Sequence, residues 1–144
     1  MVRQAHHKMT KTEILQKDAR VLRKVASNVP IKDIKSKKVR NILSKMRKAL
    51  HAEEDGVAIA APQIGESLRI FLVSGKAIHM YRGKDKKLHT KEGAEKKQDL
   101  VFINPEITRL SKKKGAMEEG CLSVRWLYGK VRRSEKVTLG AYDE

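Results

Sequence analysis

The sequence contains little of several residue types, and each scarcity restricts what the protein can be. A single cysteine among 144 residues excludes an internal disulfide and fits a reducing, cytoplasmic compartment. Aromatic residues make up 4% of the chain, so the core must consist mainly of aliphatic side chains. No apolar run approaches the ~20 residues that span a bilayer. The basic start, residues 1–12, lacks the apolar stretch of a secretory signal. We therefore expect a cytoplasmic protein with no membrane partner.

Positive charge, by contrast, is in large excess. The 33 lysines and arginines outnumber 17 aspartates and glutamates, which gives a formal net charge of +16. The basic residues recur in residues 32–48, 84–97, 112–114 and 130–136. Such a field attracts polyanions, and the ribosome or its RNA is the first candidate. The composition also fits a solvated lysine-rich surface, and the small number of aromatic side chains that could stack on bases favours this interpretation. Charge alone leaves both interpretations open.

Hydrophobic periodicity predicts one helix, from about Lys35 to Ala52. Its apolar residues recur at spacings of three and four and therefore share one face. These residues are Val39, Ile42, Leu43, Met46 and Leu50. The polar residues 53–56 end the helix and turn the chain.

Antiparallel strands are expected after this helix. Residues 68–74 and 100–103 are rich in side chains that suit a pleated sheet, and Asn104-Pro105 ends the second strand. Residues 131–141 can supply one or two more strands, whereas the lysine-rich residues 75–99 are expected to form a long hairpin excursion. The prediction is a single domain over residues 1–144, of class α+β, with a helix followed by antiparallel strands.

Two short strings carry the chemistry. The first, residues 56–63, reads GVAIAAPQ, and its small residues permit a close approach of backbone and ligand. Gln63 then offers a neutral N–H donor of the kind that stabilises an oxyanion in acyl chemistry. The alternative is a small-residue turn between helix and strand that ends in a surface glutamine.

The second string, residues 118–123, reads EEGCLS and contains the only cysteine, Cys121. A lone cysteine is commonly a buried, inert side chain. Here Gly120 frees the backbone beside it, and Glu119 can anchor a basic partner such as Arg133, which is the support that a thiolate metal ligand needs. Taken separately, neither string decides between these alternatives.

Together the two strings resemble the first two motifs of the peptide deformylases, metallohydrolases that remove the formyl group from the initiator methionine of new polypeptides. The first family motif runs glycine, apolar, glycine, apolar, Ala-Ala, any residue, Gln, and the second is Glu-Gly-Cys-Leu-Ser. The likeness extends to residues 14–23, 69–73 and 104–107, so it covers almost the whole chain. It implies a deformylase-like α+β fold and an N-formylmethionyl peptide as substrate.

The resemblance implies roles in the reaction for three residues. Cys121 would ligate a divalent metal, with Fe²⁺ the first choice and Zn²⁺ or Ni²⁺ as substitutes. Gln63 and the backbone N–H of Leu122 would bind the formyl oxygen as negative charge develops on it.

Other matching residues would shape and support the site. Gly56 would line the substrate pocket, next to Ala58, which replaces the usual second glycine and adds a methyl group. Glu119 would pair with Arg133 behind the metal and hold the loop. Arg125 stands where a proline commonly follows Cys-Leu-Ser-Val, which loosens or recharges that turn.

The third family motif, His-Glu-x-x-His, is absent from this chain. In the family it supplies the other two metal ligands and the general base, from a central helix. No histidine here has a glutamate and a second histidine at that spacing; the five are His6, His7, His51, His79 and His89. We therefore expect a truncated domain without the central metal-binding helix, inactive as an isolated chain unless a complementary C-terminal fragment supplies the missing ligands.

Without that helix, six apolar strand residues should lose much of their cover. They are Ile70, Leu72, Val101, Ile103, Val137 and Leu139. Two other functions stay open at this point. One is a non-catalytic basic module that binds RNA or the ribosome. The other is a metal-free hydrolase with Cys121 as nucleophile, which would need a base close to the thiol.

Overall fold

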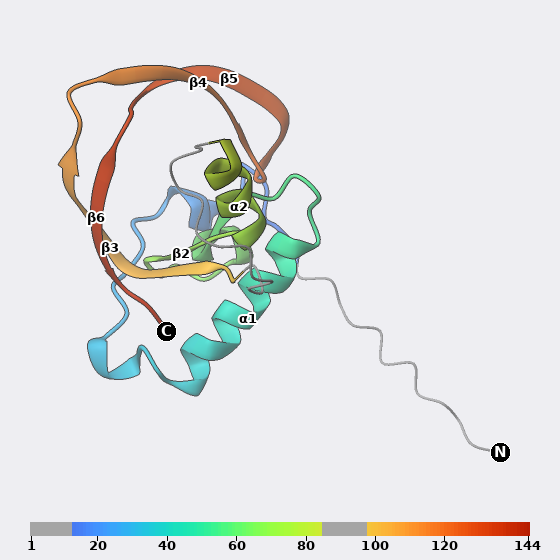
Figure 1. The fold of residues 1–144 in the computed structure, drawn as a ribbon. Coiled ribbons are helices and arrows are strands. Elements are labelled where there is room, and N and C mark those ends of the chain that lie inside the picture. Colours follow the sequence, from blue (N-terminus) through green and yellow to red (C-terminus); the bar gives the residue numbers. More distant parts are fainter. Residues whose placement is uncertain (1–12, 85–97) are drawn as a thin grey trace.

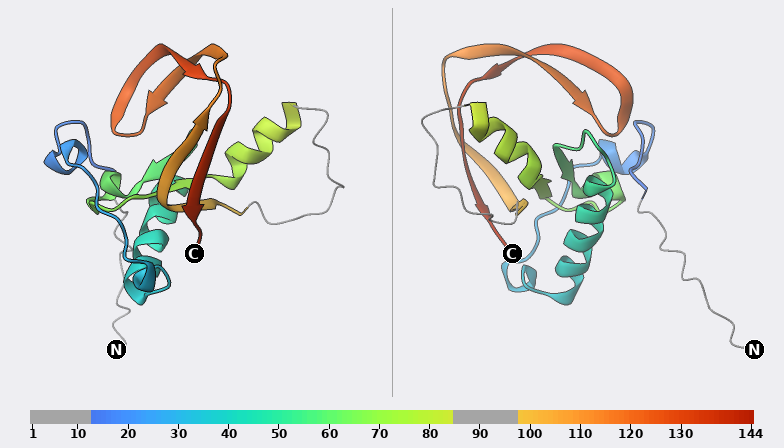
Figure 2. Two further views of the ribbon diagram at one scale, coloured as in Figure 1. Left: turned by 90° about the vertical axis from the view of Figure 1, so that its left-hand side faces the viewer. Right: turned by 45° about the vertical axis from the view of Figure 1, so that its right-hand side comes forward.

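The computed structural model describes residues 13–84 and 98–144 (Figures 1 and 2). The first part contains the 3₁₀ turns η1 (Arg20–Arg23) and η2 (Ile31–Asp33), helix α1 (Lys37–His51), strand β1 (Ala58–Ala60), the 3₁₀ turn η3 (Ala61–Ile64), strand β2 (Ile70–Val73) and helix α2 (Gly75–Lys84). The second part contains the strands β3 (Leu100–Leu110), β4 (Lys114–Cys121), β5 (Val124–Ser134) and β6 (Val137–Tyr142). The class is α+β, as predicted. Within the described residues, no helix has the length and apolar character needed to cross a membrane.

Helix α1 confirms the prediction from periodicity. It begins after Ser36, whose Oγ accepts a hydrogen bond from the backbone N–H of Val39 at 3.2 Å and so satisfies an amide of the first turn. The five apolar residues predicted for its inner face are each at most 3% exposed. Because burying a leucine-sized side chain contributes about 1.5–3 kcal/mol, this face holds α1 against the rest of the core.

The core lies between α1 and a four-stranded antiparallel sheet of order β1-β2-β3-β6. Strand β2 pairs with β1 on one side and with β3 on the other, which places Leu72 opposite both Ile59 and Val101. All three of these side chains are buried in the same cluster as the inner face of α1.

The predicted loss of cover from the sheet is wrong for four of the six residues. Ile70, Leu72, Val101 and Ile103 are all buried, because α1 and the segments that precede it pack over them. Those segments contribute Ile14, Val29 and Ile34 to the cluster. The prediction does describe β6, where Val137 is 56% exposed and Leu139 is half-buried.

Strand β3 does not end at Asn104-Pro105, as the sequence suggested, but continues to Leu110. The register shifts between Ile103 and Glu106, and Asn104 has a positive φ of 51°, so the dipeptide forms an irregularity inside the strand. The side-chain amide of Asn104 exchanges two hydrogen bonds of 2.8 Å with the backbone of Val29. This local partner compensates for the interrupted pairing, which is why a proline is tolerated there.

Residues 75–84 form helix α2, where the sequence suggested part of a hairpin excursion. Side chains outside the helix cap its start: the backbone N–H of Gly75 donates to Asp99 Oδ1 at 3.0 Å, and that of Lys76 donates to Ser74 Oγ at 3.2 Å. One of these caps comes from Asp99, the residue before β3, which is far from α2 in the sequence. The remaining expected excursion, residues 85–97, lies outside the described residues.

Strands β4 and β5 form a separate two-stranded hairpin. The sequence predicted a strand near residue 131 but not β4. Figures 1 and 2 show the hairpin as an arch that leaves the ends of β3 and β6 and bends back over the body of the molecule. Its tip returns to the N-terminal segment, where Gln16 Nε2 donates to the carbonyl oxygen of Leu122 at 3.2 Å. The arch therefore brings the second string to the first.

Candidate functional site

A cavity of about 420 Å³ lies between the turn that follows α1 and the tip of the hairpin. Both strings from the sequence contribute to its wall. The lining residues are Asp55, Val57, Ala58, Gln63, Gly120, Cys121, Leu122, Val124, Arg125, Trp126, Leu127 and Tyr128. The structure thus brings Gln63, Cys121 and Leu122 together in one pocket, on elements that are far apart in the sequence.

Gln63 is held in place by three hydrogen bonds. The backbone N–H of Leu15 donates to its carbonyl oxygen at 2.8 Å, and the backbone N–H of Ala60 donates to its side-chain Oε1 at 2.9 Å. Its Nε2 then donates to Ser123 Oγ at 3.0 Å. Since the oxygen is taken up by the protein, the amide presents its NH₂ group toward the hairpin and the pocket, and this group has a second N–H.

Leu122 and Ser123 are the two residues of the turn that joins β4 to β5, between the paired Cys121 and Val124. Ser123 is 4% exposed and anchors the turn through the bond from Gln63. In a tight turn the first central N–H points away from the turn's own hydrogen bond. The backbone N–H of Leu122 is therefore available to a ligand beside Cys121.

Cys121 is exposed and lines the pocket, so it is not the inert buried thiol of the alternative interpretation. Among the described residues, however, no three His, Cys, Asp or Glu side chains gather closely enough to hold a metal ion. His51 is engaged elsewhere, because its Nε2 lies 2.9 Å from Asp99 Oδ2. His6, His7 and His89 lie outside the described residues. The part of the chain that the structure describes therefore supplies fewer than three clustered metal donors and does not by itself fit a metal ion.

Glu119 and Arg133 form the ion pair that the sequence suggested. Arg133 Nε and Nη2 donate to the two carboxylate oxygens of Glu119 at 2.8 and 2.9 Å. These hydrogen bonds lower the pKa of Glu119 and raise that of Arg133. Glu119 is two residues from Cys121 along β4, so both side chains leave the strand on the same face. The pair runs diagonally along the exposed hairpin, because Arg133 lies opposite Gly115 in the register.

The structure corrects the role predicted for Gly56. Ala58 lines the pocket, and so do the neighbours of Gly56, but Gly56 itself does not. A Cβ on Gly56 would lie 2.6 Å from the carbonyl oxygen of Leu50, near the end of α1. This glycine is required because the chain passes close to the helix end, and it positions the pocket wall rather than forming it.

An irregular segment of β5 supplies most of the remaining wall. Gly120 pairs with Tyr128 and the next residue, Cys121, pairs with Val124, so residues 125–127 have no partner on β4. Within this bulge Trp126 has a φ of +65° and is 84% exposed. Such backbone is unfavourable for a bulky residue, and strained residues of this kind cluster at turns, ligand clamps and active sites. The only tryptophan of the chain therefore stands at the rim of the pocket.

Arg125 joins the two walls of the pocket. Its Nη2 lies 2.9 Å from Glu53 Oε2 in the turn after α1, and the two side chains are 32% and 14% exposed. The residue that the sequence marked as loosening or recharging the turn thus ties the hairpin to the helix end. Gln16, Glu53, Ser123 and Trp126 were missed as site residues. Ser123 and Trp126 had a signal, as a member of the second string and as the single tryptophan; the other two are identified only by their contacts.

Several known proteins are similar to this chain in sequence, and all of those named here are of one family. The family model described as polypeptide deformylase matches residues 11–144. A peptide deformylase from Pseudothermotoga lettingae is 36% identical over 124 residues, which are 86% of this chain and 58% of that protein. One from Desulforudis audaxviator is 32% identical over 130 residues, which are 90% of this chain and 65% of that protein. The chain thus spans less than two thirds of the length of these relatives.

Solved structures agree with the sequence relatives. A probable peptide deformylase from synechococcus phage S-SSM7 matches with a TM-score of 0.71 and 27% identity, covering 92% of this chain and 76% of that one. A class I type b peptide deformylase from Acinetobacter baumannii with bound Met-Ala-Ser matches with a TM-score of 0.70 and 27% identity, covering 90% and 75%.

Proposed function

Because the chain belongs to the polypeptide deformylase family, we propose that its pocket binds the N-formylmethionyl end of a peptide for removal of the formyl group. The observation that carries this proposal is the convergence of Gln63, Cys121 and Leu122 on one cavity. Two N–H donors, one from the Gln63 amide and one from the Leu122 backbone, stand beside the exposed thiol of Cys121. A peptide deformylase needs such a grouping, whereas a structural turn has no use for it.

The two donors would act on the formyl oxygen. Because Ala60 and Ser123 hold the Gln63 amide, the amide does not have to reorganise when charge develops on that oxygen. Preorganised donors of this type act by stabilising the transition state more than the ground state. Removing one such donor typically costs about 10²–10³ in kcat.

The rest of the lining suits the methionine side chain. Val57, Leu122, Val124 and Leu127 give the pocket an apolar wall, and Trp126 adds an aromatic surface at its rim. Pockets that bind small molecules are mostly apolar with a few placed polar groups, and the volume here is within their usual range. The Acinetobacter baumannii relative is described with bound Met-Ala-Ser, which is the deformylated form of the peptide that we propose as substrate.

A divalent metal is part of this proposal only in a limited sense. Cys121 would be one ligand of the metal that the family implies, with Fe²⁺ the first choice, and Glu119 with Arg133 would steady the strand that carries it. The described residues contain no group of three ligands at the site, so we assign no step of the reaction to a metal. Activity would require donors in addition to those of the described residues. We place the reaction in the cytoplasm, where an exposed thiol stays reduced.

The single tryptophan allows a direct test of binding. Titration of the chain with formyl-Met-Ala-Ser should change the fluorescence of Trp126, and Met-Ala-Ser without the formyl group should bind more weakly. The variant Gln63→Met keeps the size of the side chain but removes the donor, so affinity for the formyl peptide should fall about three- to tenfold, the worth of one hydrogen bond. Gln98→Met, at an exposed glutamine away from the pocket, should leave the affinity unchanged.

Equal affinity for the formylated and unformylated peptides would contradict the proposed role of the two donors. An RNA partner is a separate proposal, because it depends on surface charge and not on this pocket.

A further inference from the structure

One face of α1 carries positive charge without any compensating acid. No aspartate or glutamate occurs between Lys37 and His51. Five exposed cations of the helix have no hydrogen bond or ion pair of their side chains within the described part of the chain; they are Lys37, Lys38, Arg40, Lys45 and Lys48. We propose that this face, called the basic face below, binds the phosphate backbone of double-helical RNA.

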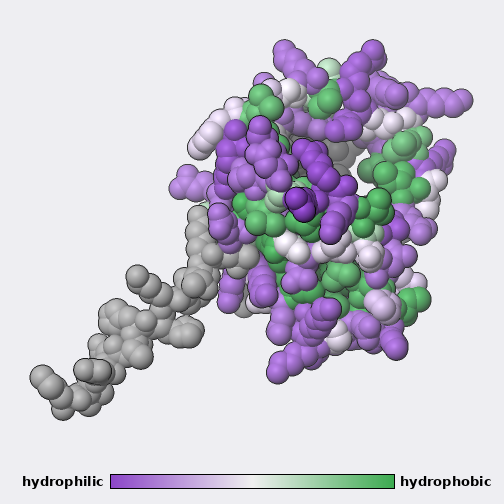
Figure 3. All heavy atoms as spheres, turned by 180° about the vertical axis from the view of Figure 1, so that it is seen from behind, coloured by the Kyte–Doolittle hydropathy of each residue, from purple (hydrophilic) through white to green (hydrophobic). Residues whose placement is uncertain are grey.

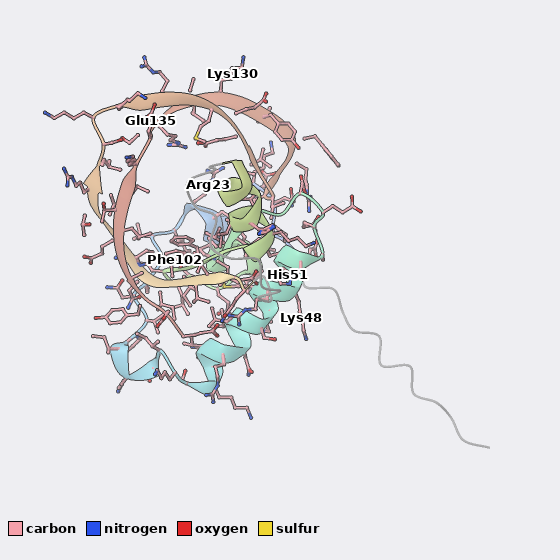
Figure 4. All side chains as sticks on the ribbon, viewed as in Figure 1. Arg23, Lys48, His51, Phe102, Lys130 and Glu135 are labelled. Atoms are coloured by element: carbon pink, nitrogen blue, oxygen red, sulfur yellow. The ribbon has the colours of Figure 1, made fainter. Side chains whose placement is uncertain are left out.

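The helix arranges these charges along one side. Lys37 and Lys48 are eleven residues apart, which is about three turns and about 16 Å along the axis, so they project in nearly the same direction. Lys48 is the last residue of this row and lies near the C-terminal end of α1 in Figure 4. The other cations lie on either side of it. Such a row spans several phosphate groups of a nucleic-acid strand.

The positive charges on the basic face destabilise α1 when no anion is bound to it. Lys37 and Lys38 occupy the first turn, where the helix dipole favours negative charge, and the first turn contains no acid. Lys45 and Lys48 repel each other at a spacing of three residues. Some other cations are neutralised in place, as in the pairs Lys113–Glu135 and Arg133–Glu119. An anionic partner would supply the compensation that these five cations of α1 lack.

The burial of α1 decides against a membrane as that partner. An amphipathic helix binds a lipid surface by inserting its apolar face. The apolar face of α1 is instead taken up by the protein core, where Leu43 and Met46 are 0% exposed. Only the charges of α1 remain for a partner. On the face that Figure 3 shows, the apolar residues form patches within a mostly hydrophilic surface.

The composition of the face also distinguishes between kinds of nucleic acid. It contains no aromatic side chain, so it cannot stack on the bases of a single strand. Between the lysines stand Asn41 and Ser44, both exposed, which can hydrogen-bond to the 2′-hydroxyls that distinguish RNA from DNA. The chemistry thus fits a duplex RNA that is bound by shape and backbone. None of these residues lines the peptide pocket, so the inference is independent of the proposed function.

Two matched variants test the proposal by fluorescence anisotropy with a labelled 20-base-pair RNA. The first neutralises the basic face: Lys37→Gln, Lys38→Gln, Lys45→Gln and Lys48→Gln. The second neutralises four exposed lysines outside α1: Lys112→Gln, Lys114→Gln, Lys130→Gln and Lys136→Gln. Each lowers the formal net charge of +16 by four, so they differ only in where the charge is lost.

The basic-face variant should lose at least about 30-fold in affinity at 0.1 M salt, and its plot of log K against log salt should be flatter by about 0.9 for each contact removed. The control should stay within about threefold of the unaltered chain. Glutamine keeps the helix propensity of lysine, so the melting temperature should be unchanged or higher. The pair Lys45→Gln with Lys48→Gln repeats the test without altering the first turn.

Equal losses in the two quadruple variants would overturn the proposal, because binding would then follow net charge alone. Binding of the unaltered chain that is absent or insensitive to salt would do the same. A DNA duplex of the same length that binds as tightly would refute the assignment to RNA, and so would anionic phosphatidylserine vesicles that compete as well as the RNA does.

Discussion

The ion pair between Arg125 and Glu53 should determine how firmly the hairpin tip is held over the pocket. The variant Arg125→Met removes the guanidinium but keeps a long apolar side chain. Exposed pairs contribute about 0.2–1 kcal/mol, whereas breaking a fully buried pair costs about 3–5 kcal/mol. With the arginine 32% and the glutamate 14% exposed, this pair lies between those limits. We expect the free energy of unfolding to fall by about 1–2 kcal/mol.

Urea unfolding followed by far-UV circular dichroism measures this change, with an m value that stays constant if the pair affects stability alone. A double-mutant cycle with Glu53→Gln isolates the pairwise part of the effect, which should be about 1 kcal/mol or more. It should persist at 0.5 M salt, because partly buried charges are screened less than exposed ones. Arg132→Met, at an exposed arginine of the same strand, serves as the control and should change stability by less than about 0.5 kcal/mol.

The pair should also affect the pocket. Arg125 is the first residue of the bulge that carries Trp126, so its loss should loosen the rim. Affinity for formyl-Met-Ala-Ser should fall several-fold, and Arg125→Lys, which keeps the charge, should restore part of it. A coupling energy below about 0.5 kcal/mol, the ordinary limit of additivity, together with unchanged peptide affinity would refute the reasoning.

Three further outcomes follow from the site. The lowered pKa of Glu119 means that its pair with Arg133 contributes stability above the unfolded glutamate pKa of about 4.3 and loses it as pH falls through the lower folded value; an NMR titration of the Glu119 carboxyl should move back toward that ordinary pKa in Arg133→Gln. The variant Gly120→Ala would place a Cβ 2.7 Å from the ring of Tyr128, so peptide affinity should drop several-fold while stability changes by less than about 1 kcal/mol, because the ring is exposed and can move. With ferrous ion added, the chain on its own should hydrolyse formyl-Met-Ala-Ser no faster than its Cys121→Ser variant, since the described residues contain no group of three metal donors; turnover that depends on Cys121 would show that the ligand argument is wrong.

How far the sequence predicted each element depended on how much of that element is buried. Helix α1 buries a full apolar face, so its periodicity was unambiguous and its bounds were predicted to within about two residues. Strand β4 buries almost nothing and consists largely of glycine and charged residues, so no alternation of polar and apolar side chains revealed it. Helix α2 was missed for a related reason: part of its N-terminal cap comes from Asp99, beyond the helix itself.

The candidate site, like the fold, was predicted only in part from the sequence. The two strings that contain Gln63 and Cys121 marked these residues only when taken together, through their resemblance to the two family motifs. The same resemblance assigned Gly56 to the pocket wall, whereas in the structure this glycine lies close to Leu50 and only its two neighbours line the pocket.

The sequence by itself therefore determined the family and the class of fold and indicated the candidate site residues, because motifs and periodicity depend on neighbours along the chain. Only the tertiary structure decided how those groups meet. The curvature of the β4–β5 hairpin, the bonds from Gln16 and Gln63 to its turn, and the ion pair of Arg125 with Glu53 together close the pocket. These contacts join residues that are distant in the sequence, and their strength depends on burial and distance, neither of which a linear pattern records.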